Sequence, residues 1–168
     1  MILDCHVHLL GEPEGNREEL LKRMKKAGVS GGVLLSPAPP SFHGLTRPAS
    51  PEERLECVLR WTSGNPRLYP FYWIDPLEDG AADQVAFAAG RGVKGFKVIC
   101  NRFYPDDKRA LAVFTRIADT GRPLLFHSGI LWDGADSSKY NRPAGFEALI
   151  DLVGLRFALA HIGWPWVD

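Results

Sequence analysis

The chain begins with MILDCHVHLL (residues 1–10), a short apolar stretch that contains two histidines, His6 and His8. A short, largely apolar run of this kind predicts a buried strand. Strand side chains alternate between two faces, so Asp4, His6 and His8 are expected on the same face. Histidine is seldom buried without a partner, and two on one face of a strand need a shared explanation.

The composition is that of an ordinary globular protein. The 168 residues are 45% hydrophobic and 24% charged, which is enough chain for one domain with a sizeable core. Lys and Arg together number 20, as do Asp and Glu, so the formal net charge is zero. This balance gives no support for binding to nucleic acid or to an anionic membrane. We therefore expect a single domain over residues 1–168.

Neither a membrane span nor a signal peptide is predicted. No apolar run approaches the ~20 residues that cross a bilayer, and the N-terminus lacks a basic segment followed by an apolar one. Cys5, Cys57 and Cys100 are odd in number and far apart, so a disulfide framework is not expected. These features predict a reduced, cytoplasmic protein.

The rest of the chain alternates between strand-like and helix-like stretches. Strands are predicted at residues 1–10, 31–36, 68–75, 93–100, 122–129 and 155–163. Helices are predicted at residues 16–28, from about 51, at 79–92, and at about 107–120 and 144–153. Asn16 and Ser50 are the expected N-caps, and Gly28 is expected to close the first helix. Six β–α alternations predict an α/β fold with a parallel sheet.

Two architectures fit this alternation, a doubly wound sheet and a (β/α) barrel. A nucleotide-binding sheet would have a glycine-rich turn after its first strand, but LLGEPEGNRE (residues 9–18) matches neither G-x-G-x-x-G nor a P-loop. A complete barrel has eight units in ~250 residues. We therefore predict a TIM-barrel type of fold with six of the expected eight β/α units. The first and sixth strands would then be open sheet edges.

Four of the five histidines lie in or at the ends of predicted strands. His6 and His8 belong to the first strand, His127 ends the fifth and His161 lies near the end of the sixth, whereas His43 is expected to be solvated in a loop. The carboxyl ends of barrel strands share one face, where active sites are built. Imidazole is the commonest metal ligand among side chains, and it suits zinc. The sequence therefore predicts a divalent-metal site, with zinc as the expected ion.

These motifs resemble those of the amidohydrolase superfamily. The resemblance extends from Leu3 to Pro165 and rests on four motifs: DCHVH at 4–8, GFK at 95–97, FHSG at 126–129 and AHIGWP at 160–165. It is closest to the amidohydrolase-related branch, which also contains metal-dependent decarboxylases of aromatic acids.

The resemblance implies that His6, His8 and His127 are metal ligands. It implies that His161 binds a second metal or acts as a catalytic group that positions substrate and water. Members of the family also carry an aspartate on the eighth strand, which binds metal and acts as general base. This chain has no predicted eighth strand, and Asp168 follows the sixth, so it cannot be assigned that role.

Lys97, near the end of the fourth predicted strand, is a second catalytic candidate. In two-metal members of the superfamily a lysine at this place carries a carbamate that bridges the ions. In one-metal members a lysine here pairs with a carboxylate of the substrate or of the protein. The protein carboxylates that could pair with Lys97 are Asp4 and Asp75.

The long loop after the fifth strand, SGILWDGADSSKYNRPAG (residues 128–145), offers substrate-binding candidates. Arg142 could form a forked contact with a carboxylate. Trp132 or Tyr140 could stack on a flat ligand. Asn101 and Arg102, directly after the fourth strand, are further candidates.

The leading functional prediction is hydrolysis of a C–N or ester (including lactone) bond in a small molecule. A divalent metal lowers the pKa of bound water to about 7 and polarises a carbonyl, so water attacks at neutral pH. The alternative is non-oxidative decarboxylation of an aromatic or unsaturated carboxylic acid, in which the metal grips a carboxylate. A third reading is a metal-binding but inactive fragment, because the expected aspartate is missing. The open strand edges are compatible with a homo-oligomer.

Overall fold

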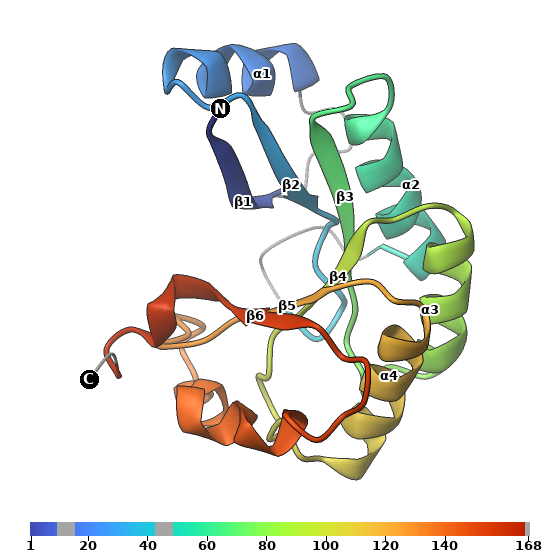
Figure 1. Cartoon of the computed structure of the whole chain (residues 1–168), viewed down its shortest axis with the longest axis vertical. Coiled ribbons are helices and arrows are strands. Elements are labelled where there is room, and N and C mark those ends of the chain that lie inside the picture. The colour runs from blue at the N-terminus through green and yellow to red at the C-terminus, as the bar shows by residue number, and fades with distance from the viewer. Residues whose placement is uncertain (10–15, 43–48, 167–168) are drawn as a thin grey trace. The chain divides into compact units, whose positions relative to one another are not determined.

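The computed structural model describes residues 1–9, 16–42 and 49–166 (Figure 1). The chain consists of two compact units, Met1–Trp73 and Ile74–Asp168. Each unit contains a parallel sheet of three strands with connecting helical segments. The predicted parallel α/β class is therefore present in both units, while the prediction of a single domain stays untested.

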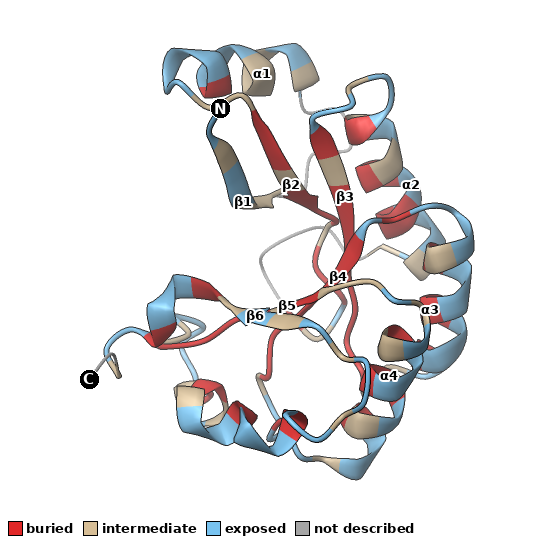
Figure 2. Ribbon diagram, in the orientation of Figure 1, coloured by how far each residue is buried: buried red, intermediate tan, exposed pale blue. Residues whose placement is uncertain are grey.

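The first unit is a three-stranded sheet with two helices. Its elements are β1 (Leu3–His8), α1 (Arg17–Lys26), β2 (Gly31–Leu35), α2 (Pro51–Thr62) and β3 (Leu68–Trp73). β2 lies between β1 and β3, and α2 packs against both β2 and β3. Figure 2 shows β2 and β3 as mainly buried and β1 as exposed or intermediate.

Both predicted N-caps are present. Asn16 Oδ1 accepts hydrogen bonds from the backbone N–H groups of Glu18 and Glu19, and Ser50 forms a reciprocal capping box with Glu53. Such caps satisfy helix-terminal donors and each contributes about 1 kcal/mol. Gly28 follows α1 with φ 74°, the left-handed conformation that commonly closes a helix.

β1 contains an irregularity just before its second histidine. Asp4 aligns with Gly32 and Val7 with Leu34, so β1 has one more residue than β2 between these two pairs. Asp4 Oδ1 accepts a hydrogen bond from the His6 N–H at this point, at 2.9 Å. A Cβ on Gly32 would lie 2.1 Å from the Asp4 carbonyl oxygen, so the pairing here requires glycine. The strict alternation predicted from the sequence is thus interrupted by a β-bulge, a feature that redirects side chains.

The second unit has the same alternation with shorter strands. Its elements are α3 (Ala81–Gly90), β4 (Gly95–Val98), α4 (Lys108–Asp119), β5 (Leu124–Phe126), the 3₁₀ segments η1 (Ser138–Asn141) and η2 (Pro143–Leu149), β6 (Phe157–Leu159) and η3 (Ala160–Gly163). β5 lies between β4 and β6, and α3 contacts α4. The Phe126 ring contacts the rings of Phe114, Phe146 and Phe157 at centroid distances of 4.9 to 5.9 Å. This aromatic cluster joins β5 to α4, η2 and β6.

Two predictions for the C-terminal part of the chain are wrong in detail. The helix expected at about 144–153 is the 3₁₀ segment η2, which contains the poor helix formers Pro143 and Gly145. The strand expected at 155–163 is only Phe157–Leu159, after which the chain turns. His161 and Ile162 have φ values of 60° and 55° in that turn. His161 therefore lies beyond the strand.

Burial is lowest in the edge strands. Within its own unit each of β1 and β6 pairs with a single strand, β1 with β2 and β6 with β5. Cys5 in β1 and Ala158 in β6 are exposed. All residues of β4 are buried (Figure 2). The three cysteines are free thiols, as expected. Among the described helices, none combines the length and the apolar character needed to cross a bilayer.

Candidate functional site

The two histidines of β1 bring their ring nitrogens together. The Nε2 atoms of His6 and His8 are 3.0 Å apart, with ring centroids separated by 4.8 Å. The His8 ring also meets Trp73, at the end of β3, edge-on at 5.2 Å. Trp73 is buried and contacts Phe42 at 5.0 Å. The pair is thus held against a packed aromatic group at the carboxyl end of the sheet.

The geometry of this pair fits two ligands of one divalent ion. Zinc binds imidazole nitrogen at about 2.0–2.1 Å in tetrahedral sites, which places two ligand nitrogens about 3.3 Å apart. The observed separation of 3.0 Å is close to that value. Within residues 1–9, 16–42 and 49–166, no group of three or more His, Cys, Asp or Glu side chains is arranged to hold a metal ion. The four-histidine centre therefore stays a prediction.

His127 and His161 form a second pair, in the second unit. Their ring centroids are 4.8 Å apart, and His127 is buried. The His127 Nε2–H donates to the Ile130 carbonyl at 3.1 Å, because a carbonyl oxygen can only accept. The neutral His127 ring then carries its lone pair on Nδ1. Fixing the tautomer through a backbone carbonyl is typical of metal-binding imidazoles.

The turn that carries His161 is held against the end of β5. The Ile130 N–H donates to the Trp164 carbonyl at 3.0 Å. Gly129 has φ 107°, and a Cβ there would lie 2.3 Å from the same carbonyl oxygen. Only glycine allows this approach, so the position next to His127 and Ser128 is constrained by backbone packing.

The electrostatic environment keeps His161 uncharged. Burial lowers the pKa of His161, and the positive charge of Lys97 lowers it further. The ordinary histidine pKa is 6.5, so the His161 ring is neutral at pH 7. A neutral imidazole can bind a metal or accept a proton.

Lys97 is fully buried in β4, with 0% of its surface exposed. Its Nζ makes no hydrogen bond in the part of the chain that the structure describes. Burial lowers the pKa of Lys97 to about 7. A large fraction of Lys97 is therefore an uncharged amine at neutral pH. Burial also raises the pKa of the Cys100 thiol, which stays protonated.

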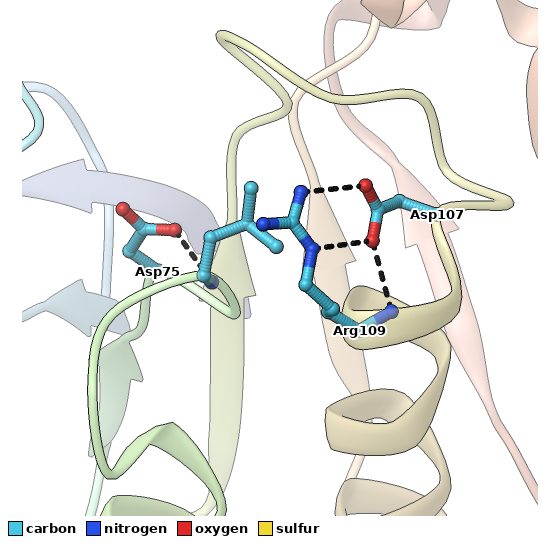
Figure 3. Close-up of polar contacts among 4 residues, drawn as sticks. Asp75, Asp107 and Arg109 are labelled. Atoms are coloured by element: carbon cyan, nitrogen blue, oxygen red, sulfur yellow. Dashed lines mark hydrogen bonds and ion pairs between the residues drawn. The ribbon is translucent and has the colours of Figure 1, made fainter.

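Asp75 has a partner other than Lys97. Its Oδ2 forms an ion pair with Arg102 Nη2 at 2.7 Å, and its Oδ1 accepts a hydrogen bond from the Leu77 N–H at 2.9 Å (Figure 3). The suggested Asp75–Lys97 pair is therefore not formed. The Arg102–Asp75 contact was missed in the sequence, although both residues come shortly after strands.

The other predicted substrate-binding residues differ in their surroundings. Trp132 is 81% exposed, and Asn101, three residues after the end of β4, is half-buried. The Arg142 guanidinium lies 5.1 Å from the centre of the Trp166 ring, and Tyr140 packs edge-on against Tyr104 at 4.8 Å. Their roles in substrate binding stay predictions.

Asn141 is a buried residue that sequence analysis missed. Its amide group donates to the carbonyls of Cys100 and Ser137, at 2.7 and 3.3 Å. Its own carbonyl accepts a hydrogen bond from the Gly129 N–H at 2.8 Å. Asn141 thus ties the loop after β5 to the end of β4. No sequence signal distinguishes it from the other polar residues of that loop. His43 and Asp168 lie outside the described residues.

Comparison with known proteins identifies the class of protein that these features belong to. A family model described as amidohydrolase matches residues 3–168. The chain belongs to this amidohydrolase family, whose members are enzymes and are generally metal-dependent. The resemblance of the four sequence motifs to this family is thereby confirmed, and family membership supports the prediction of an amidohydrolase-type enzyme. A comparison with curated proteins finds no match.

Solved structures show the same fold. A probable 2-pyrone-4,6-dicarboxylic acid hydrolase from Acinetobacter baumannii, crystallised with citric acid, has a TM-score of 0.51 and 12% identity, over 76% of this chain and 49% of that one. A 2,6-dihydroxybenzoate decarboxylase from Rhizobium has a TM-score of 0.60 and 16% identity, over 96% of this chain and 66% of that one. The decarboxylase in complex with 2,6-dihydroxybenzoate gives the same TM-score and identity, over 97% and 66%.

The likeness at these identities concerns the fold alone, and it confirms the predicted TIM-barrel type. The chain spans about half the length of the hydrolase structure and about two thirds of the decarboxylase structure.

Proposed function

We propose that the chain is a metal-dependent hydrolase that cleaves a C–N or ester (including lactone) bond of a small molecule. The observation that carries this proposal is the 3.0 Å separation of the His6 and His8 Nε2 atoms, which suits two ligands of one ion. In this proposal His6, His8 and His127 hold a divalent metal, with zinc as the expected ion. His161 binds a second metal or positions substrate and water.

A bound divalent ion would supply a Lewis acid that activates water and polarises a carbonyl. The remaining steps fall to side chains of this chain. His161 is neutral because its pKa is lowered, so it is the group proposed to accept a proton. Lys97 is largely uncharged because burial lowers its pKa to about 7. It either carries a carbamate, as in two-metal members of the superfamily, or pairs with a substrate carboxylate.

The proposal is tested first by metal content. The double variant His6→Ala/His8→Ala should lose almost all the zinc that the wild type retains after dialysis, as measured by plasma mass spectrometry. His43→Ala is the matched control, because His43 is the one histidine outside the proposed ligand set, and it should retain zinc. Unchanged stoichiometry in the double variant would place the metal elsewhere.

Turnover is tested next, with added zinc or manganese, on a panel of lactones, amides and aromatic carboxylates. Hydrolysis of a lactone or amide that disappears with the metal supports the proposal. Bound metal without any turnover would favour the third reading, an inactive metal-binding fragment.

Decarboxylation of an aromatic acid is the second candidate function. We include it because a solved structure of the same fold, matched over 96% of this chain, is a 2,6-dihydroxybenzoate decarboxylase. The basic side chains Lys97 and Arg102, both close to the end of β4, also suit an anionic substrate. Release of carbon dioxide from an aromatic acid, with no hydrolysis of lactones or amides, would select this function instead.

A further inference from the structure

We propose that Arg102 binds a carboxylate group of the substrate and that Asp75 positions the Arg102 guanidinium for this contact. The inference rests on the function proposed above and narrows its substrate class to carboxylic acids. Both residues belong to the second unit. Asp75 follows shortly after β3, and Arg102 follows shortly after β4. The carboxyl ends of strands are where α/β proteins build their binding sites.

The Asp75 carboxylate is buried, and its two oxygens already have partners. Its side chain is only 4% exposed, and a buried carboxylate is costly unless it is paired and hydrogen-bonded. One carboxylate oxygen accepts the Leu77 N–H at 2.9 Å (Figure 3), and the other meets Arg102 Nη2 at 2.7 Å. Both oxygens are therefore engaged. The role left for Asp75 is to hold Arg102 in place.

Arg102 is only partly used by this pair. Its side chain is 43% exposed, and Nη2 is the atom that meets Asp75. In the described ranges, its Nη1 and Nε atoms make no hydrogen bond. A guanidinium has five N–H donors in a planar fork that matches a carboxylate. Arg102 is thus fixed on one side and keeps donors for a second, accessible carboxylate.

The surrounding charges favour an anion. Lys97 belongs to β4 and Arg102 follows the same strand by a few residues. Asp75 is the carboxylate that pairs with Arg102. A substrate carboxylate would add a second anion to this basic region.

A second Arg–Asp pair in this unit shows what a purely structural pair looks like. Asp107 is the N-cap of α4, and Arg109 binds it through Nε and Nη2 at 3.2 and 3.0 Å (Figure 3). Asp107 also accepts the Arg109 backbone N–H at 2.8 Å. This pair is local in sequence, and the Arg109 side chain is 71% exposed. Arg109 therefore provides a matched control for Arg102.

The test is direct binding, which does not depend on turnover. Dissociation constants would be measured by calorimetry for benzoate, 2,6-dihydroxybenzoate and 2-pyrone-4,6-dicarboxylate, and for the carboxamide of each, with and without added zinc. The wild type should bind at least one carboxylate about ten- to a hundredfold more tightly than its carboxamide, the range expected for a charge-assisted hydrogen bond. Arg102→Gln should abolish this preference, and Arg109→Gln should leave it unchanged.

Two further variants separate positioning from folding. Asp75→Asn should weaken carboxylate binding while leaving carboxamide binding unchanged, because it loosens Arg102 without removing its charge. Arg102→Lys keeps a cation beside Asp75 but lacks the planar fork, and it should lose most of the preference. It replaces Arg102→Gln in the test if circular dichroism shows that Arg102→Gln does not fold.

The inference is overturned if the carboxylate preference survives in the Arg102 variants, or if Arg109→Gln removes it equally. It is also overturned if the wild type shows no preference for any of the three carboxylates. If the wild type fails to bind zinc but shows the predicted carboxylate preference, the proposed metal site is refuted and this inference stands. If the wild type binds zinc but the carboxylate preference fails the tests above, this inference alone is refuted.

Discussion

Replacing Lys97 with methionine should make the protein more stable at neutral pH. Lys97 is 0% exposed, and its Nζ has no hydrogen-bond partner among the described residues. A charged ammonium in such a place is strongly disfavoured, which is why its pKa falls from 10.5 to about 7. Methionine has a similar length and no charge, so Lys97→Met keeps the packing and removes the desolvation cost.

The size of the effect follows from the pKa. One pKa unit corresponds to about 1.4 kcal/mol, so a fall from 10.5 to about 7 costs the charged form about 5 kcal/mol. At pH 7 about half of Lys97 is neutral in the native state, and the cost is then about 4 kcal/mol. Between pH 7 and 10.5 the unfolded chain binds more protons at this lysine than the native chain does. The free energy of unfolding of the wild type therefore rises with pH across this window. We expect Lys97→Met to be more stable by about 2–4 kcal/mol at pH 7, and the difference should shrink toward pH 10.

The assay is urea unfolding at pH 6, 7, 8, 9 and 10 in carbonate-free buffer, since a carbamate would turn Lys97 into an anion. Lys94→Met is the control, because Lys94 is exposed and directly precedes β4. It should change stability by less than about 0.5 kcal/mol at every pH. The reasoning is refuted if Lys97→Met is destabilising at pH 7, or if its difference from the wild type is independent of pH.

Three further predictions concern local geometry. Gly32→Ala should destabilise the protein by about 1–3 kcal/mol in chemical unfolding, because the new Cβ would meet the Asp4 carbonyl oxygen at 2.1 Å. Gly90→Ala is the control, because a Cβ there meets nothing within 4 Å. Asn141→Ala should cost about 1–3 kcal/mol, because the buried Cys100 carbonyl loses its donor, and an unchanged midpoint would show that the contact is dispensable. The His161 ring signals in an NMR titration should show a pKa below 6.5. Because the native state then binds fewer protons than the unfolded chain, stability should fall as the pH drops below about 6.5, and a pKa above 6.5 would contradict the assigned environment.

The elements that sequence predicts well are those specified by local chemistry. The Asn16 and Ser50 caps, the closing Gly28 and the alternation of strands and helices all depend on residues close together in the chain. The turn at His161 depends instead on the fit of Gly129 against the Trp164 carbonyl. Packing between distant segments decides such features, and no periodic pattern encodes it.

The same distinction applies to the candidate site. The histidine pair of β1 is visible as an HxH motif, because adjacent positions of the same parity share a face. The partner of Asp75 is invisible in the sequence, since Lys97 and Arg102 are equally plausible cations near the end of the same strand. The hydrogen bond from Asn141 to Cys100 joins residues 41 positions apart. The sequence therefore indicates which side chains are candidates for catalysis or binding. It does not indicate which other residues fix those side chains in position.

Lys97 and Arg102 together give a physical reason to regard the end of β4 as a binding region. A native domain is stable by only about 5–15 kcal/mol, so a group that costs about 4 kcal/mol is a large burden for a purely structural role. A buried methionine or leucine would fill the position of Lys97 at lower cost. Arg102 is held by a buried carboxylate but keeps donors exposed, which contributes little to stability. Both features make sense if an anionic group approaches this end of the strand, because it would stabilise the charged form of Lys97 and engage the remaining donors of Arg102.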